Sequence, residues 1–413
     1  MSTTRKLRSY LAVAAALALA ILLGACGTTV SPTALPAEID VRKLNVGKYP
    51  TEPRNAHDAA YVPNFYEMGK VAAMRLSDHV VSAYEIDKTM KYGMHSGTIP
   101  GRPDELGDWS AVEQIIKRNK MMFGFESQGS DNASTSLAFP GWPVPSPAKS
   151  RYAATMVMQF PDADRATTAA TEFHEADFAT FKDSNQPVSL PKHHAAQSHW
   201  RPDAPVLRTV LAHGSYVVAF LISTPETDLN ALTTLADRAY DLQLAQLDQL
   251  PALTAAQTID LPWDPDRLLD RVLDPDSKQL KPGYDDDDGF VSGSHGMLHF
   301  AKDRELADTR FSALNIGRFA ALGRTPVIQL ADDAAARAVV RDRVTMTAVA
   351  RDAAAPPGVP DSACVENQES GTRSKRFTCI VAYHRYVGFV SANQLGDAQQ
   401  QAAAQYALFA NNR

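Results

Sequence analysis

The stretch that decides the fold is YAATMVMQF, residues 152–160. Its run of apolar and β-branched residues predicts a strand. Asp162 follows directly, and the pattern of residues 166–178 predicts a helix. The sequence therefore places a helix immediately after a strand that is buried along its whole length.

The next segment continues this order. Residues 206–212 and 216–222 predict two strands joined into a hairpin around His213-Gly214-Ser215. Thr227 or Asp228 then caps a long helix that we expect to run to about Leu250. Strand, helix, hairpin and helix make up one unit.

The same order returns 170 residues later. The pairs that match at this offset are Val157/Val327, Gln159/Gln329, Phe160/Leu330, Asp162/Asp332, Ala166/Ala336, Ala212/Ala382, Tyr216/Tyr386, Val217/Val387 and Thr227/Asp397. One offset serves all the elements, which indicates an internal duplication rather than chance identity. We expect two related α+β units, each an antiparallel sheet with helices packed on one face.

The chain has 413 residues, more than a typical single domain. We expect the first α+β unit over residues 46–257, a proline-rich linker over 258–283 and the second unit over 284–413. Met297–Ala301 is the expected first strand of the second unit, and its closing helix is expected to begin at Asp397 with Gln400 in a capping box.

Three further elements are expected before residue 150. The apolar positions of Phe65–Val81 predict a helix, and Trp109–Arg118 predicts a second, shorter helix capped by Asp108. Met121–Phe125 predicts a strand. Residues 129–147 are rich in Gly, Ser and Pro and are expected to form a loop.

The start of the chain has the three parts of an export signal. Basic residues at positions 5, 6 and 8 precede an apolar run over 11–23, and Leu23-Gly24-Ala25-Cys26 forms a lipobox. Residues 1–25 are the predicted signal peptide, and Cys26 is the predicted site of a diacylglyceryl group and a further acyl chain such as palmitate. An uncleaved membrane span needs about 20 apolar residues, and an ordinary signal peptide has no cysteine at its cleavage site.

Residues 26–45 are the predicted lipidated tether that would hold the folded protein at the outer face of the cytoplasmic membrane. The formal charge of the whole chain is −6, and it becomes −9 once the three basic residues of the leader are removed. Without clustered Lys and Arg, such a chain is a poor candidate for binding nucleic acid.

Cys364 and Cys379 are the two other cysteines. An even pair in an exported protein predicts a disulfide, which would stabilise the fold by about 3 kcal/mol. The alternatives are two free thiols or a metal bound by two lone cysteines. The intervening segment is polar and is expected to turn at Glu369-Ser370-Gly371.

No catalytic residue, cofactor site or metal ligand is predicted, because each candidate motif is incomplete. The sequence contains no Gly-x-Ser-x-Gly elbow and no glycine-rich phosphate loop. Phe178 stands where a zinc-protease helix beginning at His174-Glu175 needs its second histidine. His193, His194 and His199 lack a partner at a recognised zinc spacing.

Asp285–Asp288, with His295 and His299 nearby, is the strongest candidate for a cation site. Clustered carboxylates suit Ca²⁺, but this run lacks the alternation and the distal glutamate of an EF-hand. Adjacent aspartates also repel one another and are typical of a solvated turn. Residues 139–143, Phe-Pro-Gly-Trp-Pro, either line a ligand groove or cover the edge of a core.

The lipobox, Gly47–Thr51, His299-Phe300 and Ala404-Gln405-Tyr406 together resemble a family of uncharacterised lipoproteins from mycolic-acid-bearing actinobacteria. The resemblance spans most of the mature chain and implies a membrane-anchored, extracytoplasmic α+β protein. It brings no established activity and no catalytic residues. The disulfide hairpin before a terminal helix also resembles, more weakly, the sensor domains of actinobacterial envelope kinases.

These observations favour a non-enzymatic envelope lipoprotein, anchored through Cys26, that binds an envelope lipid, glycan or protein partner. The alternative is a metal-dependent hydrolase that acts on envelope material through the region of Asp285–His299.

Overall fold

The computed structural model of the chain describes residues 39–53, 62–99, 106–133, 150–264, 266–276, 289–323, 325–344, 350–368 and 375–412. Cys26, the signal peptide, Phe139–Pro143 and Asp285–Asp288 lie outside the described residues.

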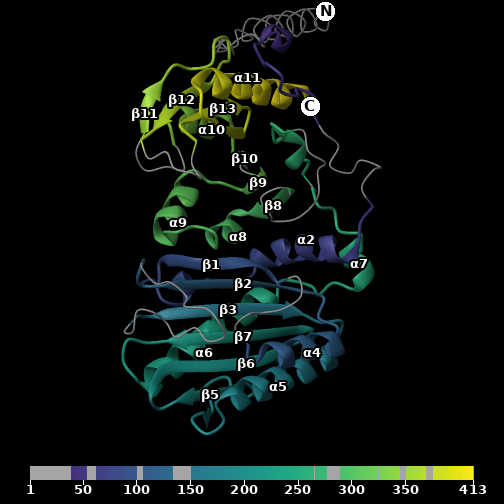
Figure 1. Cartoon of the computed structure of the whole chain (residues 1–413), viewed down its shortest axis with the longest axis vertical. Coiled ribbons are helices and arrows are strands. Elements are labelled where there is room, and N and C mark those ends of the chain that lie inside the picture. The colour runs from purple at the N-terminus through teal and green to yellow at the C-terminus, as the bar shows by residue number, and fades with distance from the viewer. Residues whose placement is uncertain are drawn as a thin grey trace, which may run out of the picture. The chain divides into compact units, whose positions relative to one another are not determined.

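Seven antiparallel strands form the first sheet, in the order β1-β2-β3-β7-β6-β5-β4 (Figure 1). They are β1 Tyr92–Ile99, β2 Phe123–Ser130, β3 Tyr152–Gln159, β4 Gln186–Val188, β5 Gln197–Arg201, β6 Ala204–His213 and β7 Tyr216–Ser223. The helices of this half are α2 Phe65–Ser77, α3 Ala83–Ile86, α4 Trp109–Asn119, α5 Ala163–Thr180, α6 Leu229–Leu247 and α7 Ala255–Ile259, and a 3₁₀ helix, η1, spans Val41–Lys43.

A second sheet has the order β8-β9-β10-β14-β13-β12-β11 when it is read from its other edge. Its strands are β8 Gly289–Gly293, β9 Arg318–Leu322, β10 Thr325–Gln329, β11 Ala350–Ala353, β12 Ser362–Asn367, β13 Phe377–Tyr383 and β14 Tyr386–Ala392. Its helices are η2 Leu269–Arg271, α8 Ser294–Leu298, α9 Arg304–Ala313, α10 Asp333–Arg341 and α11 Leu395–Asn411.

The two sheets have the same topology, so the predicted duplication is confirmed. The pairing of β7 with β3 and β6, and that of β14 with β10 and β13, keeps the offset of 170 residue by residue. Val157 pairs with Val218 in the first sheet, and Val327 pairs with Gly388 in the second. The helix caps agree as well, because Asp162 accepts the N–H of Arg165 at 2.8 Å and Asp332 accepts that of Ala335 at 2.8 Å. The α+β class and the two related units therefore follow directly from the sequence pattern.

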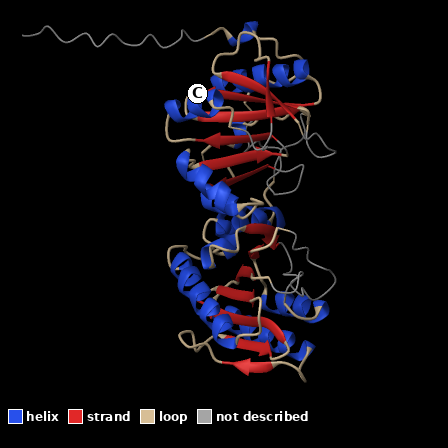
Figure 2. Ribbon diagram, turned by 90° about the vertical axis from the view of Figure 1, so that its left-hand side faces the viewer, coloured by secondary structure: helices blue, strands red, loops and turns tan. Residues whose placement is uncertain are grey.

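Helices cover both faces of each sheet, which corrects the expectation of helices on one face (Figure 2). In the first sheet, Val157 belongs to the core under α6, whereas Met156 and Met158 belong to the core under α5. In the second sheet, the neighbouring residues Val327 and Ile328 likewise belong to two different cores, one on each face of the sheet. The physical reason is visible in the sequence, because a strand with both faces buried has a continuous apolar run instead of an alternating one.

Two expectations for the second half are wrong, one about its first strand and one about the start of its closing helix. Met297–Ala301 is not a strand, because α8 occupies Ser294–Leu298 and the first strand is β8. The carboxylate of Asp78 accepts the backbone N–H groups of Gly293 and Gly296 at 2.9 and 2.7 Å, and so caps α8 from a distant part of the chain. A cap supplied by tertiary structure leaves no local signal in the sequence.

The closing helix, α11, begins at Leu395 rather than at Asp397, and its N-cap Gln394 forms no side-chain cap bond. Asp397 lies in the first turn and is used elsewhere, as described below. The predicted caps of α4 and α6 are confirmed, since the side chains of Asp108 and Asp228 accept the first N–H groups of these helices.

The edge of the first sheet is covered by the chain of the second half. Gly93 of β1 donates to the carbonyl of Lys302 at 3.0 Å, and Arg304 donates its backbone N–H to Lys91 at 2.8 Å. Phe290 and Phe300 pack against the core of the first sheet. The two halves of the chain are therefore joined by backbone bonds as well as by apolar packing.

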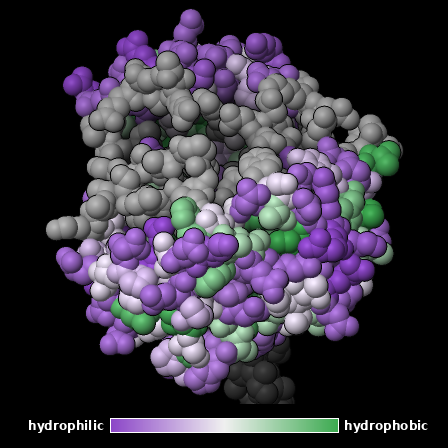
Figure 3. Space-filling view, turned by 60° about the horizontal axis from the view of Figure 1, so that its bottom comes forward, coloured by the Kyte–Doolittle hydropathy of each residue, from purple (hydrophilic) through white to green (hydrophobic). Residues whose placement is uncertain are grey.

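On the face shown in Figure 3, the coloured residues are mainly hydrophilic, and hydrophobic residues form small areas between them. Among the helices that the structure describes, none combines the length and the apolar character needed to cross a membrane.

Candidate functional site

Cys364 and Cys379 face each other on β12 and β13 and form a disulfide. Both cysteines are buried, with exposed fractions of 1% and 0%. The disulfide therefore joins two neighbouring strands of the second sheet and belongs to its core, which is a structural role.

Among the residues that the structure describes, His295 and His299 form no cation site. His295 bonds the carbonyl of Asp78 at 2.7 Å through Nδ1 and the carboxylate of Glu85 at 3.0 Å through Nε2. Both partners accept, so the ring donates from both nitrogens and is an imidazolium. Burial favours the neutral ring, but the bond to Glu85 and its charge raise the pKa of His295 to about 9.

His299 has the opposite character. Its Nε2 donates to the carbonyl of Ser77 at 3.1 Å, and its Nδ1 accepts from the hydroxyl of Ser127 at 2.7 Å. Burial, together with the charges of His295 and Arg304, lowers the pKa of His299 to about 3. Because protein groups occupy the ring nitrogens of both histidines, neither is open to a metal ion.

Beside them lies Arg304, which is 0% exposed. Its Nη2 donates to the carbonyl of Gln128 at 2.8 Å and to the hydroxyl of Ser127 at 3.1 Å. Burial lowers the pKa of this guanidinium to about 10, which leaves it charged at neutral pH. The group fits because Gly129 has no side chain, since a Cβ there would lie 2.6 Å from Nη1. These contacts hold α9 against β2.

The other candidate histidines are dispersed. His193 bonds Asp241 at 2.9 Å, whereas His199 is buried on β5, 3.8 Å from Asp177. Burial and the charge of Arg208 lower the pKa of His199 to about 3. Within the described ranges, no three His, Cys, Asp or Glu side chains gather in a way that could hold a metal ion.

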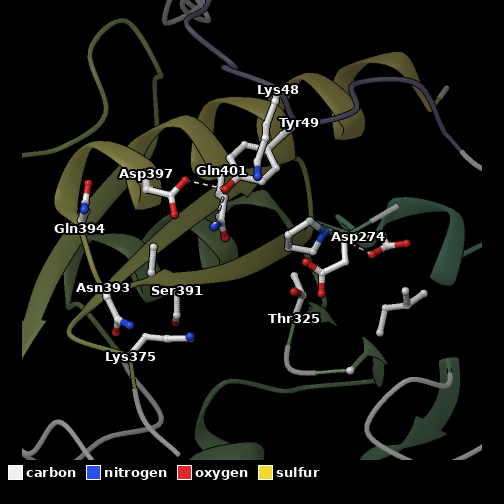
Figure 4. A pocket seen from close by; sticks show the side chains of 15 residues that line it. Lys48, Tyr49, Asp274, Thr325, Lys375, Ser391, Asn393, Gln394, Asp397 and Gln401 are labelled. Atoms are coloured by element: carbon white, nitrogen blue, oxygen red, sulfur yellow. Dashed lines mark hydrogen bonds between the residues drawn. The ribbon is translucent and has the colours of Figure 1, made fainter. Parts of the chain in front are cut away.

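A pocket of about 680 Å³ lies beside the first turn of α11 (Figure 4). Its volume is within the range of small-molecule sites. The lining comes from five separate parts of the chain: Lys48 and Tyr49, Asp274–Asp276, the turn between β9 and β10, Lys375, and Ser391–Gln401. The fold, and not one motif, brings these residues together.

The floor of the pocket is a hydrogen-bonded chain of three side chains. The hydroxyl of Tyr49 donates to the carboxylate of Asp397 at 2.5 Å, and the amide of Gln401 donates to the same hydroxyl at 3.2 Å. Burial and the bond to Asp397 raise the pKa of Tyr49, which keeps its hydroxyl protonated. The floor therefore has a fixed proton arrangement at neutral pH.

The rim of the pocket differs from its floor. Gln401 is 6% exposed and Thr325 is 7% exposed, whereas Lys48 and Lys375 are exposed. The lining thus combines an acceptor-bearing floor with two exposed cations: Lys48, whose Nζ lies 5.8 Å from the centroid of the Tyr49 ring, and Lys375, which comes from a separate part of the chain. This arrangement can hold a polar molecule in one orientation.

Sequence reasoning did not identify this pocket. In the sequence, Tyr49 stands out only as part of the Gly47–Thr51 stretch that carries the family resemblance, and the pattern around Asp397 predicts only the start of a helix. A buried tyrosine beside a carboxylate 348 positions later in the chain leaves no local pattern.

Comparisons with known proteins agree with the two-unit fold. Residues 59–263 match the family model "Domain of unknown function (DUF7373) N-terminal", and residues 268–412 match its C-terminal counterpart. No curated protein matches the chain.

Among solved structures, the extracellular domain of PknH from Mycobacterium tuberculosis is similar, with a TM-score of 0.28 and 11% identity. The alignment covers 43% of this chain and 96% of that one. A similarity this weak carries no argument about function. The two family models cover most of the sequence, and the chain therefore belongs to the DUF7373 family.

Proposed function

We propose that this chain is an exported lipoprotein that binds a small polar ligand from the cell envelope in the pocket beside α11. The observation that carries the proposal is the floor, where Gln401 lines the pocket, is 6% exposed, and has no partner for its amide oxygen among the described residues (Figure 4). Buried polar groups are normally satisfied within the protein. One held open toward a cavity is typical of a binding site.

The lining supports binding rather than covalent catalysis. Its described residues include neither histidine nor cysteine. The hydroxyl of Ser391 bonds Thr378 at 3.0 Å instead of a general base. Activation of a nucleophile needs such a base within hydrogen-bond reach.

Location at the outer face of the cytoplasmic membrane is supported by the lipobox and by the disulfide. Disulfides persist in oxidising compartments, outside the cytosol. Two or more acyl chains on Cys26 would give a stable anchor.

The anchor is tested with a Cys26→Ser variant of the full chain, expressed in an actinobacterial host. We expect the unchanged protein in the membrane fraction and the variant in the medium or as an unprocessed precursor. Thr28→Ser serves as the control and should stay in the membrane. A Cys26→Ser protein that is cleaved and retained like the unchanged protein would disprove lipid anchoring.

Ligand binding is tested by mass spectrometry of small molecules released from the full chain after purification from membranes. We expect at least one molecule to accompany the unchanged protein and the Gln399→Leu control, and to be depleted in Gln401→Leu. Gln399 lies on the same helix and bonds the carbonyl of Ala354 instead of facing the pocket. Equal recovery from both variants would refute binding in this pocket.

A further inference from the structure

We infer that the pocket takes a ligand with a primary ammonium group at its inner end and an anionic group at its outer end, of the size of a short peptide. The inference rests on the proposed function and specifies the chemistry of the ligand.

The floor offers acceptors for the inner end. Because Gln401 uses its Nε2 to donate to Tyr49, its Oε1 remains as an acceptor, and this atom has no protein partner among the described residues. Asp397 receives the hydroxyl of Tyr49 on one carboxylate oxygen, and within the same residues its second oxygen has no partner either.

An ammonium group has three donors and no acceptor, so it complements this pair of oxygens. The bond to the carboxylate would be charge-assisted and therefore stronger than a bond from a neutral hydroxyl. A ligand anion is disfavoured at the floor, because Asp274, Asp276 and Asp397 all line the pocket.

The entrance offers the opposite charge. Lys375 lines the pocket, is exposed, and forms no ion pair with a carboxylate of the described chain. Its ammonium group can reach a carboxylate or phosphate at the outer end of a ligand. Lys48 is exposed as well, but its Nζ lies over the ring of Tyr49, 5.8 Å from the centroid, and so it belongs to the floor side of the pocket. The two ends of the pocket therefore fix the direction in which a zwitterion enters.

The test is isothermal titration calorimetry on the full chain, purified in a non-ionic detergent without a sugar headgroup. The probes are triglycine, N-acetyl-triglycine, triglycine amide and lactose. Relative to triglycine, the N-acetyl form lacks the ammonium group and the amide form lacks the carboxylate. Lactose carries neither charge. We expect triglycine to bind at least tenfold more tightly than the N-acetyl form, with a smaller loss for the amide and no binding of lactose.

Variants assign each end of the ligand. Asp397→Asn keeps the shape of the floor and is expected to abolish the preference for triglycine over N-acetyl-triglycine. Lys375→Met is expected to abolish the preference for triglycine over triglycine amide. Asp183→Asn removes an exposed charge from the first half and should bind like the unchanged protein, while thermal melting of each variant reports that it is folded.

Two results would overturn the inference: equal affinity for triglycine and its N-acetyl form, or no binding of triglycine. Binding of lactose in place of triglycine would leave the proposed function standing with a neutral ligand. Failure of the proposed function itself shows separately, as the absence of any copurified molecule that depends on Gln401.

Discussion

Three buried glutamines, Gln159, Gln243 and Gln405, each bond two backbone groups of a distant segment. Gln405 on α11 accepts the N–H of Leu273 at 3.0 Å and donates to the carbonyl of Arg271 at 2.7 Å. No strand pairs with the loop around η2, and the side chain of Gln405 supplies hydrogen-bond partners for two of its backbone groups. The carboxylate of Asp264 accepts three further N–H groups of the same loop, so two buried side chains together satisfy its backbone.

Gln405→Leu keeps the approximate volume of the side chain and removes both bonds. We expect it to lower the free energy of unfolding by about 2–4 kcal/mol, because two buried backbone groups lose their partners. Urea unfolding followed by circular dichroism measures the loss. The matched variant Gln399→Leu should change stability by less than about 1 kcal/mol, since its side chain lies near solvent; an equal loss in both would contradict this explanation.

At the scale of the element, α8 is held to the first half by charge. Glu85 of α3 accepts from Ser82 as well as from His295. Burial opposes its ionisation, but these bonds and the charge of His295 lower the pKa of Glu85 to about 2. The pair is therefore ionised throughout the neutral range.

The pH dependence of stability follows from the two shifts. The pKa of His295 is raised from about 6.5 to about 9, so its contribution is complete below pH 6.5 and is lost as the pH rises toward 9. The pKa of Glu85 is lowered, so its contribution is present above about pH 4.5 and is lost as the pH falls toward 2. This pair therefore stabilises the protein most between these limits.

Urea unfolding at pH 5.5, 7.5 and 9 tests the direction in which stability changes with pH. We expect the stability of the unchanged protein to fall from pH 6.5 to 9, and Glu85→Gln to remove that fall. Asp248→Asn disrupts the more exposed pair with His213 and is expected to have little effect. A fall of the same size in Glu85→Gln would assign it to other groups.

The disulfide also acts on one element, the hairpin of β12 and β13. Its reduction, or replacement of both cysteines by alanine, should cost about 3 kcal/mol. Hydrogen exchange should accelerate at the amides of β12 and β13 and stay unchanged at those of β3 and β7. Uniform acceleration in both sheets would show that the two halves unfold as one cooperative unit.

The elements that the sequence predicted are those whose local pattern is strong. β3 and β7 are buried along their length and have continuous apolar runs. β1, with the sequence YGMHSGTI, was missed because most of its residues are only half-buried and it follows no clear alternation. Its pairing with the segment around Lys302 depends on the other half of the molecule.

For the whole molecule, the duplication was predictable because one offset relates strand, cap and hairpin. The pocket was not predictable, because its lining spans Lys48 to Gln401 and no two of its segments share a motif. The backbone contacts along the edge of β1 could not be predicted either, because they come from a segment about 200 positions later in the chain. Contacts at such separations follow from topology, not from local pattern.

These contacts between the two halves lead us to predict how each half behaves when it is expressed alone. Residues 46–257 expressed alone should associate or aggregate, because the outer edge of β1 and the surface that meets Phe290 and Phe300 become exposed. Addition of separately expressed residues 258–413 should restore a defined complex on size-exclusion chromatography. A first half that is monomeric and fully stable alone would show that the cover is dispensable.

The position of Tyr49 has a practical consequence for anyone who shortens this protein. The family models begin at residue 59, and a chain trimmed to that boundary would retain both sheets. It would lack the phenol that orients Gln401 and Asp397. We therefore expect a protein trimmed at this boundary to give a negative result when binding to the proposed pocket is assayed, even where both of its sheets are intact.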